Sequence, residues 1–231
     1  RHRICQADLS THRTMIVLGL TMSWWLTACT TAAHALPFTI ESRQTINDLA
    51  PRPATASELT LHLSVANIDH WDAAVVIAAL RTAATLLAQC TIRVTGADLL
   101  QITVPESHRY FATPRSRELA QALALPKPTL YFTAGTRQTP AFDAEAIGRG
   151  NSRNRPELTD TVWIARGARD LGQVIAHELA HVLMDSGAHD DTPGNLMTEE
   201  TAPQNTQLNA AQCTQMRNTG TRNGLLRRSV N

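Results

Sequence analysis

Apolar and polar residues alternate along positions 59–68, a pattern that predicts a half-buried β-strand. One face of this strand is apolar and consists of Leu59, Leu61, Leu63 and Val65. Shorter apolar runs predict further strands, at positions 91–94, 99–104, 129–133 and 161–165. Gly96 is expected to form a turn between the first two of these runs. The segment 134–156 is expected to be a loop, with a short edge strand near 144–147.

Helical periodicity replaces this alternation after position 68. Apolar residues recur at helical spacing from Trp71 to Cys90, and Asp69 is expected to cap this helix. A shorter helix is predicted over 113–123, with proline at its first position, where proline is tolerated. A last helix is expected over 209–217. This order of elements predicts an α+β fold in which a mixed, twisted sheet is backed by two helices. The C-terminal part is expected to be small and mostly irregular before its final helix.

One further helix, predicted over 171–184, carries the motif H-E-x-x-H. Asp170, with Gln173 three residues later, is expected to form a capping box at its start. The helix has an apolar side for burial against the sheet. His177 and His181 lie one turn apart on the neighbouring face, because residues at i and i+4 project in the same direction.

These two histidines predict a metal site. Imidazole nitrogens suit zinc, and two of them on one helix leave room for a third protein ligand and a water. Glu178 is offset from the two ligands, so it is expected to act as the general base that takes the proton of that water. The motif therefore indicates zinc-dependent hydrolysis.

The third ligand is expected after the helix. Gly187 can adopt a positive φ and reverse the chain, which would bring His189 to the ion. The tripeptide Asn195-Leu196-Met197 follows shortly afterwards. Other carboxylates could replace His189, namely Asp185, Asp190, Asp191, Glu199 and Glu200.

In these residues the chain resembles the metzincin metallopeptidases, whose pattern is H-E-x-x-H-x-x-G-x-x-H followed by a methionine turn. The resemblance implies that His177 and His181 are the first two zinc ligands, that Glu178 is the base and that Met197 is the turn methionine, and His189 is expected to be the third ligand. It departs from the pattern after the second histidine. Positions 184 and 187 would be glycine and histidine in the family, but they are methionine and glycine here, so the third histidine comes two residues late. No tyrosine follows Met197, and the role of oxyanion stabiliser is unassigned.

The first 28 residues are predicted to be a signal peptide. The apolar run 15–28 follows Arg13 and is too short to span a bilayer. Its end, Leu26-Thr27-Ala28-Cys29, resembles a bacterial lipobox, which would place a lipid on Cys29. The alternative is ordinary signal-peptidase cleavage after Ala33-His34-Ala35. The lipobox is favoured because it lies at the correct end of the apolar run.

The remaining chain is expected to be a linker, 29–57, followed by one folded domain, 58–231. Export to the periplasmic side is predicted, with a lipid anchor in the outer membrane or, failing that, secretion. Cys90 and Cys213 are an even pair in an oxidising compartment and either form a disulfide or remain two buried thiols. The formal net charge of +1 makes no electrostatic case for a nucleic-acid partner.

These observations favour a zinc metalloendopeptidase that acts on a protein or peptide substrate. Two alternatives stay open. The chain could be a non-catalytic metal-binding lipoprotein, or a zinc hydrolase that acts on a non-peptide amide. The remaining histidines considered, His62, His70 and His108, are expected to be ordinary surface residues.

Overall fold

The computed structural model describes residues 38–47, 49, 57–137, 146–149, 155–199 and 201–229. These residues belong to one compact unit that spans Leu36–Asn231. The predicted signal peptide, both of its cleavage signals and Cys29 lie outside the described residues.

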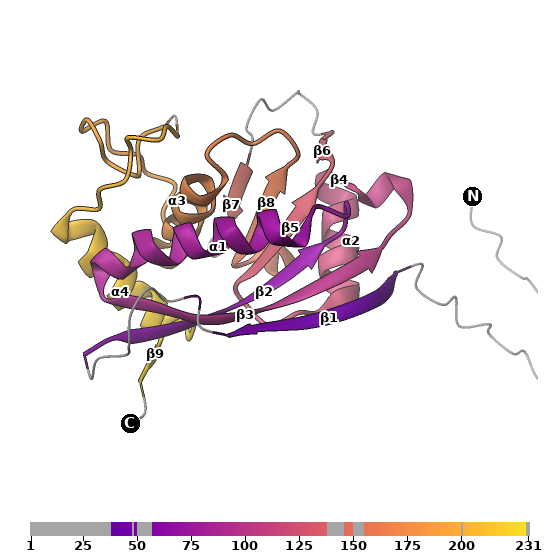
Figure 1. Ribbon diagram of the computed structural model, residues 1–231, viewed down its shortest axis with the longest axis horizontal. Helices are drawn as coiled ribbons and strands as arrows, with labels where there is room; N and C mark the ends of the chain where they lie inside the picture. Colours follow the sequence, from indigo (N-terminus) through magenta and orange to yellow (C-terminus); the bar gives the residue numbers. More distant parts are fainter. Residues whose placement is uncertain are drawn as a thin grey trace, which may run out of the picture. The chain divides into compact units, whose positions relative to one another are not determined.

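A mixed sheet forms the centre of this unit (Figure 1), with strand order β1-β3-β2-β5-β8-β7 and the short strand β9 beside β2. Its strands are β1 (Thr39–Asn47), β2 (Leu59–Asn67), β3 (Ile92–Thr103), β5 (Thr129–Thr133), β7 (Ala146–Arg149), β8 (Thr161–Ala165) and β9 (Arg227–Arg228). The inner strands run parallel, whereas β1 and β7 pair antiparallel at the two edges. The strands β4 (Tyr110–Phe111) and β6 (Gly135–Thr136) form a separate small sheet.

Helices cover both faces of the central sheet (Figure 1). They are α1 (Ala73–Leu87), α2 (Thr113–Leu123), α3 (Leu171–Met184) and α4 (Ala210–Arg222), with the short 3₁₀ helices η1 (Ala88–Cys90), η2 (Glu106–His108) and η3 (Pro156–Leu158). Helices α1 and α3 pack together on one face, and α4 packs against α3. Both α2 and α3 have the predicted bounds. The predicted α+β fold with a mixed sheet is confirmed.

The alternation within single strands explains the two hydrophobic cores. In β5, Leu130 and Phe132 face the core that contains α1, α3 and α4. Tyr131 points the other way and stacks on Trp163 of β8, with ring centroids 4.0 Å apart, in the core that contains α2. A strand buried on both sides needs apolar residues at every position, which is why these strands are continuous apolar runs in the sequence.

Strand β1 corrects one boundary, because it lies within the predicted linker 29–57. Thr39–Asn47 pairs antiparallel with β3, although eight of its nine residues have exposed side chains and only Ile46 is buried. Main-chain hydrogen bonds hold this edge strand in place. Few of its side chains contact a core, so the segment carries no apolar alternation by which it could be predicted.

The turn expected at Gly96 is also wrong, because β3 is one continuous strand of 12 residues. Gly96 pairs with Asn47 on one side and with His62 on the other. A Cβ added at Gly96 would lie only 2.5 Å from the carbonyl oxygen of Ile46. The glycine therefore permits close approach of β1 to β3, which is the other common reason for a glycine inside a strand.

The first helix is capped by Asp72 and not by Asp69. The Asp72 carboxylate accepts a hydrogen bond from the backbone N–H of Ala74 at 2.8 Å. Asp69 is instead buried, 3% exposed, and its carboxylate accepts from Nε of Arg109 at 2.9 Å and from Nε of Arg166 at 2.7 Å. This carboxylate joins the loops that follow β2 and β8 to the segment before β4.

Cys90 and Cys213 form a disulfide, with their Cα atoms 4.7 Å apart. The bond joins η1, at the end of the first helix, to the first turns of α4. Of the two alternatives left open by the sequence, the bonded one is therefore present.

Candidate metal centre

Helix α3 presents the motif from a well-packed position. Every residue from Val174 to Met184 is buried, because the helix is enclosed by α1, α4 and the sheet. Asp170 does occupy the N-cap position, but it has φ 49° and makes no side-chain capping hydrogen bond. The predicted capping box is therefore absent. Burial along most of its length, and not the cap, stabilises this helix.

The helix ends at Asp185, which reverses the chain. Asp185 is left-handed, with φ 50°, and the next residue, Ser186, donates its N–H to the carbonyl of His181 at 3.2 Å. Gly187 was expected to make this turn, but its φ is not positive. The chain therefore reverses where the sequence predicted, but Asp185 makes the turn and Gly187 does not. Aspartate is one of the few non-glycine residues that enter the left-handed region readily.

The reversal brings His189 back to the two helical histidines. The Nε2 atom of His181 lies 2.9 Å from Nε2 of His177 and 3.2 Å from Nε2 of His189. The ligand atoms of all three rings lie within 4.8 Å of one another. Within the described ranges, this is the only group of three or more His, Cys, Asp or Glu residues with such spacing.

Backbone carbonyls define the protonation of the two buried rings. Nδ1 of His177 lies 2.8 Å from the carbonyl oxygen of Leu196, and Nδ1 of His181 lies 2.7 Å from that of Ser186. A carbonyl oxygen only accepts, so each Nδ1 carries the proton and donates it. In the neutral rings, each Nε2 then offers a lone pair to the centre of the cluster. This is the outer-shell arrangement that orients metal-ligating histidines.

Burial keeps these rings neutral. Desolvation lowers the pKa of His177, and desolvation together with the neighbouring His177 lowers the pKa of His181 to about 4. Neutral rings whose lone pairs approach within 2.9 Å repel one another unless they share a cation. Three nitrogens at about 2.0–2.1 Å from one tetrahedral zinc ion would lie about 3.3 Å apart, close to the distances of 2.9 and 3.2 Å from Nε2 of His181 to the other two rings. The donor set therefore fits a metal ion of this kind.

The tripeptide Asn195-Leu196-Met197 forms a buried turn beside the cluster. The side-chain oxygen of Asn195 accepts from the N–H of Met197 at 2.8 Å, and the N–H of Leu196 donates to the carbonyl of Gln207 at 2.7 Å. Met197 is 1% exposed and belongs to the core that contains α3. Because the Leu196 carbonyl accepts from His177, this turn directly orients one ring of the cluster.

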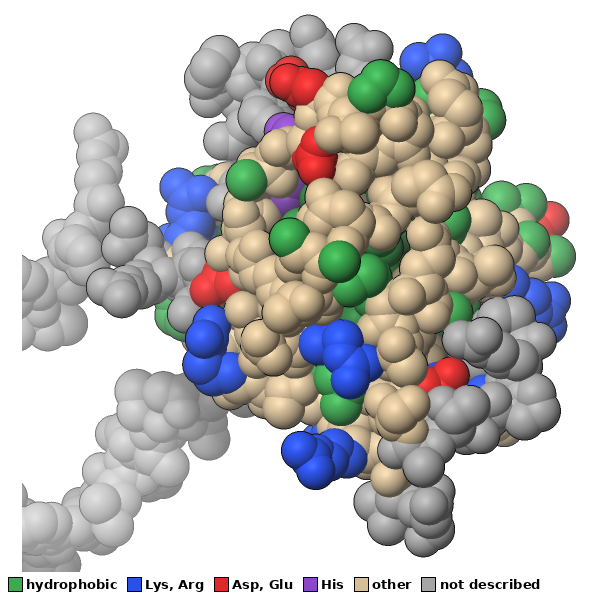
Figure 2. Space-filling view, turned by 90° about the vertical axis from the view of Figure 1, so that its left-hand side faces the viewer, with side chains coloured by type: hydrophobic (Ala, Val, Ile, Leu, Met, Phe, Trp, Pro, Cys, Tyr) green, Lys and Arg blue, Asp and Glu red, His purple; other side chains and the backbone are tan. Residues whose placement is uncertain are grey.

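Glu178 lies between the two helical histidines in sequence and is 9% exposed. Those alternative carboxylates that the structure describes do not join the histidine cluster. Asp190 faces α4, while Asp185, Asp191 and Glu199 are exposed, and Glu200 lies outside the described residues. On the face shown in Figure 2, histidine side chains reach the surface close to acidic side chains.

Two of the remaining histidines are exposed as expected, and one is not. His62 and His70 are surface residues. His108 is buried, 4% exposed, with its Nε2 3.2 Å from a carboxylate oxygen of Glu118 and its ring against Phe38. It was missed because it follows a proline and a polar turn, and only the packing of α2 over that turn encloses it.

No family model and none of the curated proteins match the chain. Among solved structures it is similar to metalloproteinase-II from Bacteroides fragilis, with 17% sequence identity and a TM-score of 0.48. The similarity covers 74% of this chain and 55% of that one, so the chain spans little more than half the length of that structure. A likeness this distant carries no conclusion about activity.

Proposed function

We propose that this protein is a zinc-dependent peptidase in which His177, His181 and His189 hold the metal and Glu178 is the general base. One observation carries the proposal. Two histidine rings, each oriented by a backbone carbonyl, point their Nε2 lone pairs at a common centre, and a third ring reaches the same centre from an irregular segment.

The number and type of donors favour a catalytic site over a structural one. Structural zinc sites are commonly closed by four protein ligands, whereas catalytic sites have three and keep one position for water. Zinc bound here would supply Lewis-acid activation of that water. The residue between the first two ligands is a buried glutamate, which a purely structural site does not need.

Glu178 has two tasks in this proposal. Its carboxylate takes a proton from the attacking water and later gives that proton to the leaving amine, so the same group serves both halves of the hydrolysis. His177 and His181 stay neutral because burial lowers the pKa of both rings. A peptide substrate is preferred over another amide because the motif and the Asn-Leu-Met turn resemble the metzincins.

Export and a lipid on Cys29 are part of the same proposal. The Cys90–Cys213 disulfide supports it, since structural disulfides persist in oxidising compartments and are rare in the cytosol. A protein or peptide is the proposed partner, and the membrane is contacted only through the lipid.

The test combines metal content with a base-deficient variant. The purified protein should contain one zinc per chain and cleave a denatured protein substrate, and a chelator should abolish cleavage. Glu178→Gln preserves shape and removes the base, so we expect cleavage to fall by about 10²–10⁴-fold with zinc retained. His177→Ala should lose both zinc and cleavage.

The outcomes separate the three functions. Stoichiometric zinc without any Glu178-dependent cleavage of peptides or amides would favour a metal-binding protein. Glu178-dependent hydrolysis of small amides, with no cleavage of peptides, would favour the non-peptide hydrolase. A protein that binds no zinc would contradict all three.

A further inference from the structure

His189 differs from the other two candidate ligands in how it is held. His177 and His181 lie on a buried helix, whereas His189 is exposed on an irregular segment. Among the described residues no hydrogen bond holds its Nδ1, unlike the Nδ1 atoms of the other two rings. Apart from the contact of its Nε2 with His181, at 3.2 Å, the position of its ring is therefore set by the backbone on which it lies.

Asp190, the next residue, fastens that backbone at several points. Its N–H donates to the carbonyl of Met197 at 2.8 Å, and its Oδ1 accepts from the N–H of Thr192 at 3.0 Å. Its Oδ2 accepts from Nδ2 of Asn209 at 3.0 Å and from Nε2 of Gln212 at 3.3 Å. The Asp190 carboxylate thus joins the segment that carries His189 to the first turn of α4.

The side-chain oxygens of these two amides are held in place, although the NH₂ group of Gln212 also donates to Oδ1 of Asn195, at 3.1 Å. The side-chain oxygen of Asn209 accepts from the N–H of Gln212, and the side-chain oxygen of Gln212 accepts from the N–H of Asn209, both at 2.9 Å. This reciprocal capping box fixes both oxygens on the helix and directs both NH₂ groups toward Asp190. An acceptor is required at that position.

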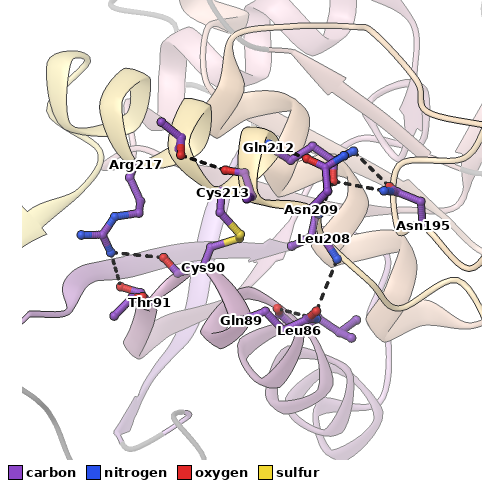
Figure 3. Close-up of a disulfide and its surroundings, with 12 residues drawn as sticks. Leu86, Gln89, Cys90, Thr91, Asn195, Leu208, Asn209, Gln212, Cys213 and Arg217 are labelled. Atoms are coloured by element: carbon purple, nitrogen blue, oxygen red, sulfur yellow. Dashed lines mark hydrogen bonds between the residues drawn. A yellow bond between two sulfur atoms is a disulfide. The ribbon is translucent and has the colours of Figure 1, made fainter. Parts of the chain in front are cut away.

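Helix α4 is itself tied to the end of the first helix (Figure 3). The Cys90–Cys213 disulfide lies one residue from Gln212, and Arg217 donates to the carbonyls of Cys90 and Thr91, both at 3.2 Å. The segment before α4 is tied there too, since the N–H of Leu208 donates to the side chain of Gln89 at 3.3 Å. The helix start is therefore fixed relative to the core.

We infer that Asp190 is the positioning residue of the third metal ligand, with α4 and its disulfide as the anchor. The chain of contacts runs from Cys90 through Cys213 and Gln212 to Asp190 and so to His189. The inference rests on the proposed function, since it concerns how well the histidine cluster holds its metal.

Asp190→Asn is the direct test, because an amide has one acceptor oxygen where the carboxylate has two. Either the N–H of Thr192 or the NH₂ groups of Asn209 and Gln212 then lose their acceptor. We expect the zinc affinity, measured by competition with a chelator, to fall by about 10–100-fold, as for other outer-shell changes. The visible spectrum of the Co²⁺-substituted protein should change with it, reporting a lost or displaced nitrogen ligand. Asp191→Asn, an identical change on the exposed neighbour, should alter neither.

Cys90→Ser/Cys213→Ser tests the anchor and should weaken zinc binding in the same direction. Leu119→Ala, in the core on the other side of the sheet, controls for general loss of stability and should leave the zinc affinity unchanged. Equal affinity and an equal Co²⁺ spectrum in Asp190→Asn and the unchanged protein would overturn the inference alone. Absence of zinc from the unchanged protein would overturn the proposed function as well.

Discussion

Asp160, the residue before β8, has a carboxyl group that is largely removed from water. The residue is 9% exposed, and its Oδ1 is buried with no hydrogen-bond partner in the part of the chain that the structure describes. Desolvation raises the pKa of Asp160 to about 6, against the opposing attraction of Lys127. Desolvation also lowers the pKa of Lys127 to about 8. Each charge of this pair is only partly compensated by the other.

Asp160→Asn should stabilise the protein at neutral pH. A raised folded-state pKa favours folding fully below the ordinary value of 3.8, and this contribution is lost as the pH rises through about 6. At pH 8 the variant should therefore be more stable than the unchanged protein by up to about 3 kcal/mol, and at pH 4 by little. Asparagine also tolerates the φ of 54° at this position.

Urea unfolding at pH 4, 6 and 8 measures this difference, with Asp191→Asn as an exposed control that should show none. A difference that stays constant from pH 4 to pH 8 would contradict the argument, since it would not arise from ionisation of this carboxyl group.

At the scale of elements, the approach of α3 to α1 depends on Gly172. A Cβ added there would lie 2.4 Å from the Cβ of Thr82 and 3.2 Å from the carbonyl oxygen of Ala79. The nearer atom is the branched carbon of a residue on α1, which cannot move without moving that helix. The absence of a side chain at Gly172 thus allows α3, which carries the motif, to pack closely against α1.

Gly172→Ala should destabilise the fold by about 1–3 kcal/mol, because it overpacks the contact between two helices. Gly187→Ala is the matched control. No atom lies within 4 Å of an added Cβ at Gly187 and its φ is not positive, so the change should stay within about 0.5 kcal/mol. Equilibrium denaturation of both variants measures this, and a tolerated Gly172→Ala would show that α1 and α3 can separate freely.

Helix α3 could be predicted from the local pattern of apolar residues, and strand β1 could not. The bounds of α3 could be predicted because apolar residues recur at helical spacing along Leu171–Met184. Strand β1 has almost no buried side chain, so its existence depends on the free edge of β3. That edge exists only after the sheet has formed.

At the scale of the whole molecule, a bound metal would join α3 to the irregular segment that carries His189. Ligands that bind only the folded state stabilise it by mass action, by about 2.7 kcal/mol at 100 times the dissociation constant. For a domain of this size, we expect saturating zinc to raise the melting temperature by about 5–10 °C over that of the chelator-treated protein.

Thermal unfolding with zinc and with a chelator measures this effect. His177→Ala should melt at the same temperature under both conditions, since it lacks one ligand on the buried helix. An equal zinc-dependent rise in His177→Ala would place the responsible metal elsewhere on the molecule.

The sequence by itself determined those features that depend on residues close together in the chain. The period of apolar residues predicted four of the strands and the helix that carries His177, Glu178 and His181, because burial of one face is written into local spacing. It also placed a chain reversal after that helix and named His189 as the returning ligand, since the distance along the chain suits a short reversal.

Tertiary structure alone decided which groups meet. It assigned the reversal to Asp185, buried Asp69 between two arginines and directed Asp190 to the first turn of α4. It also joined Cys90 to Cys213 across 123 residues. The reversal at Asp185 is a local turn, whereas the other three depend on contacts between segments that are separate in the sequence, and such contacts leave no periodic trace in either partner. The candidate ligands could be identified from nearby residues in the sequence. The contacts that hold the third one, His189, in place could be seen only in the folded structure.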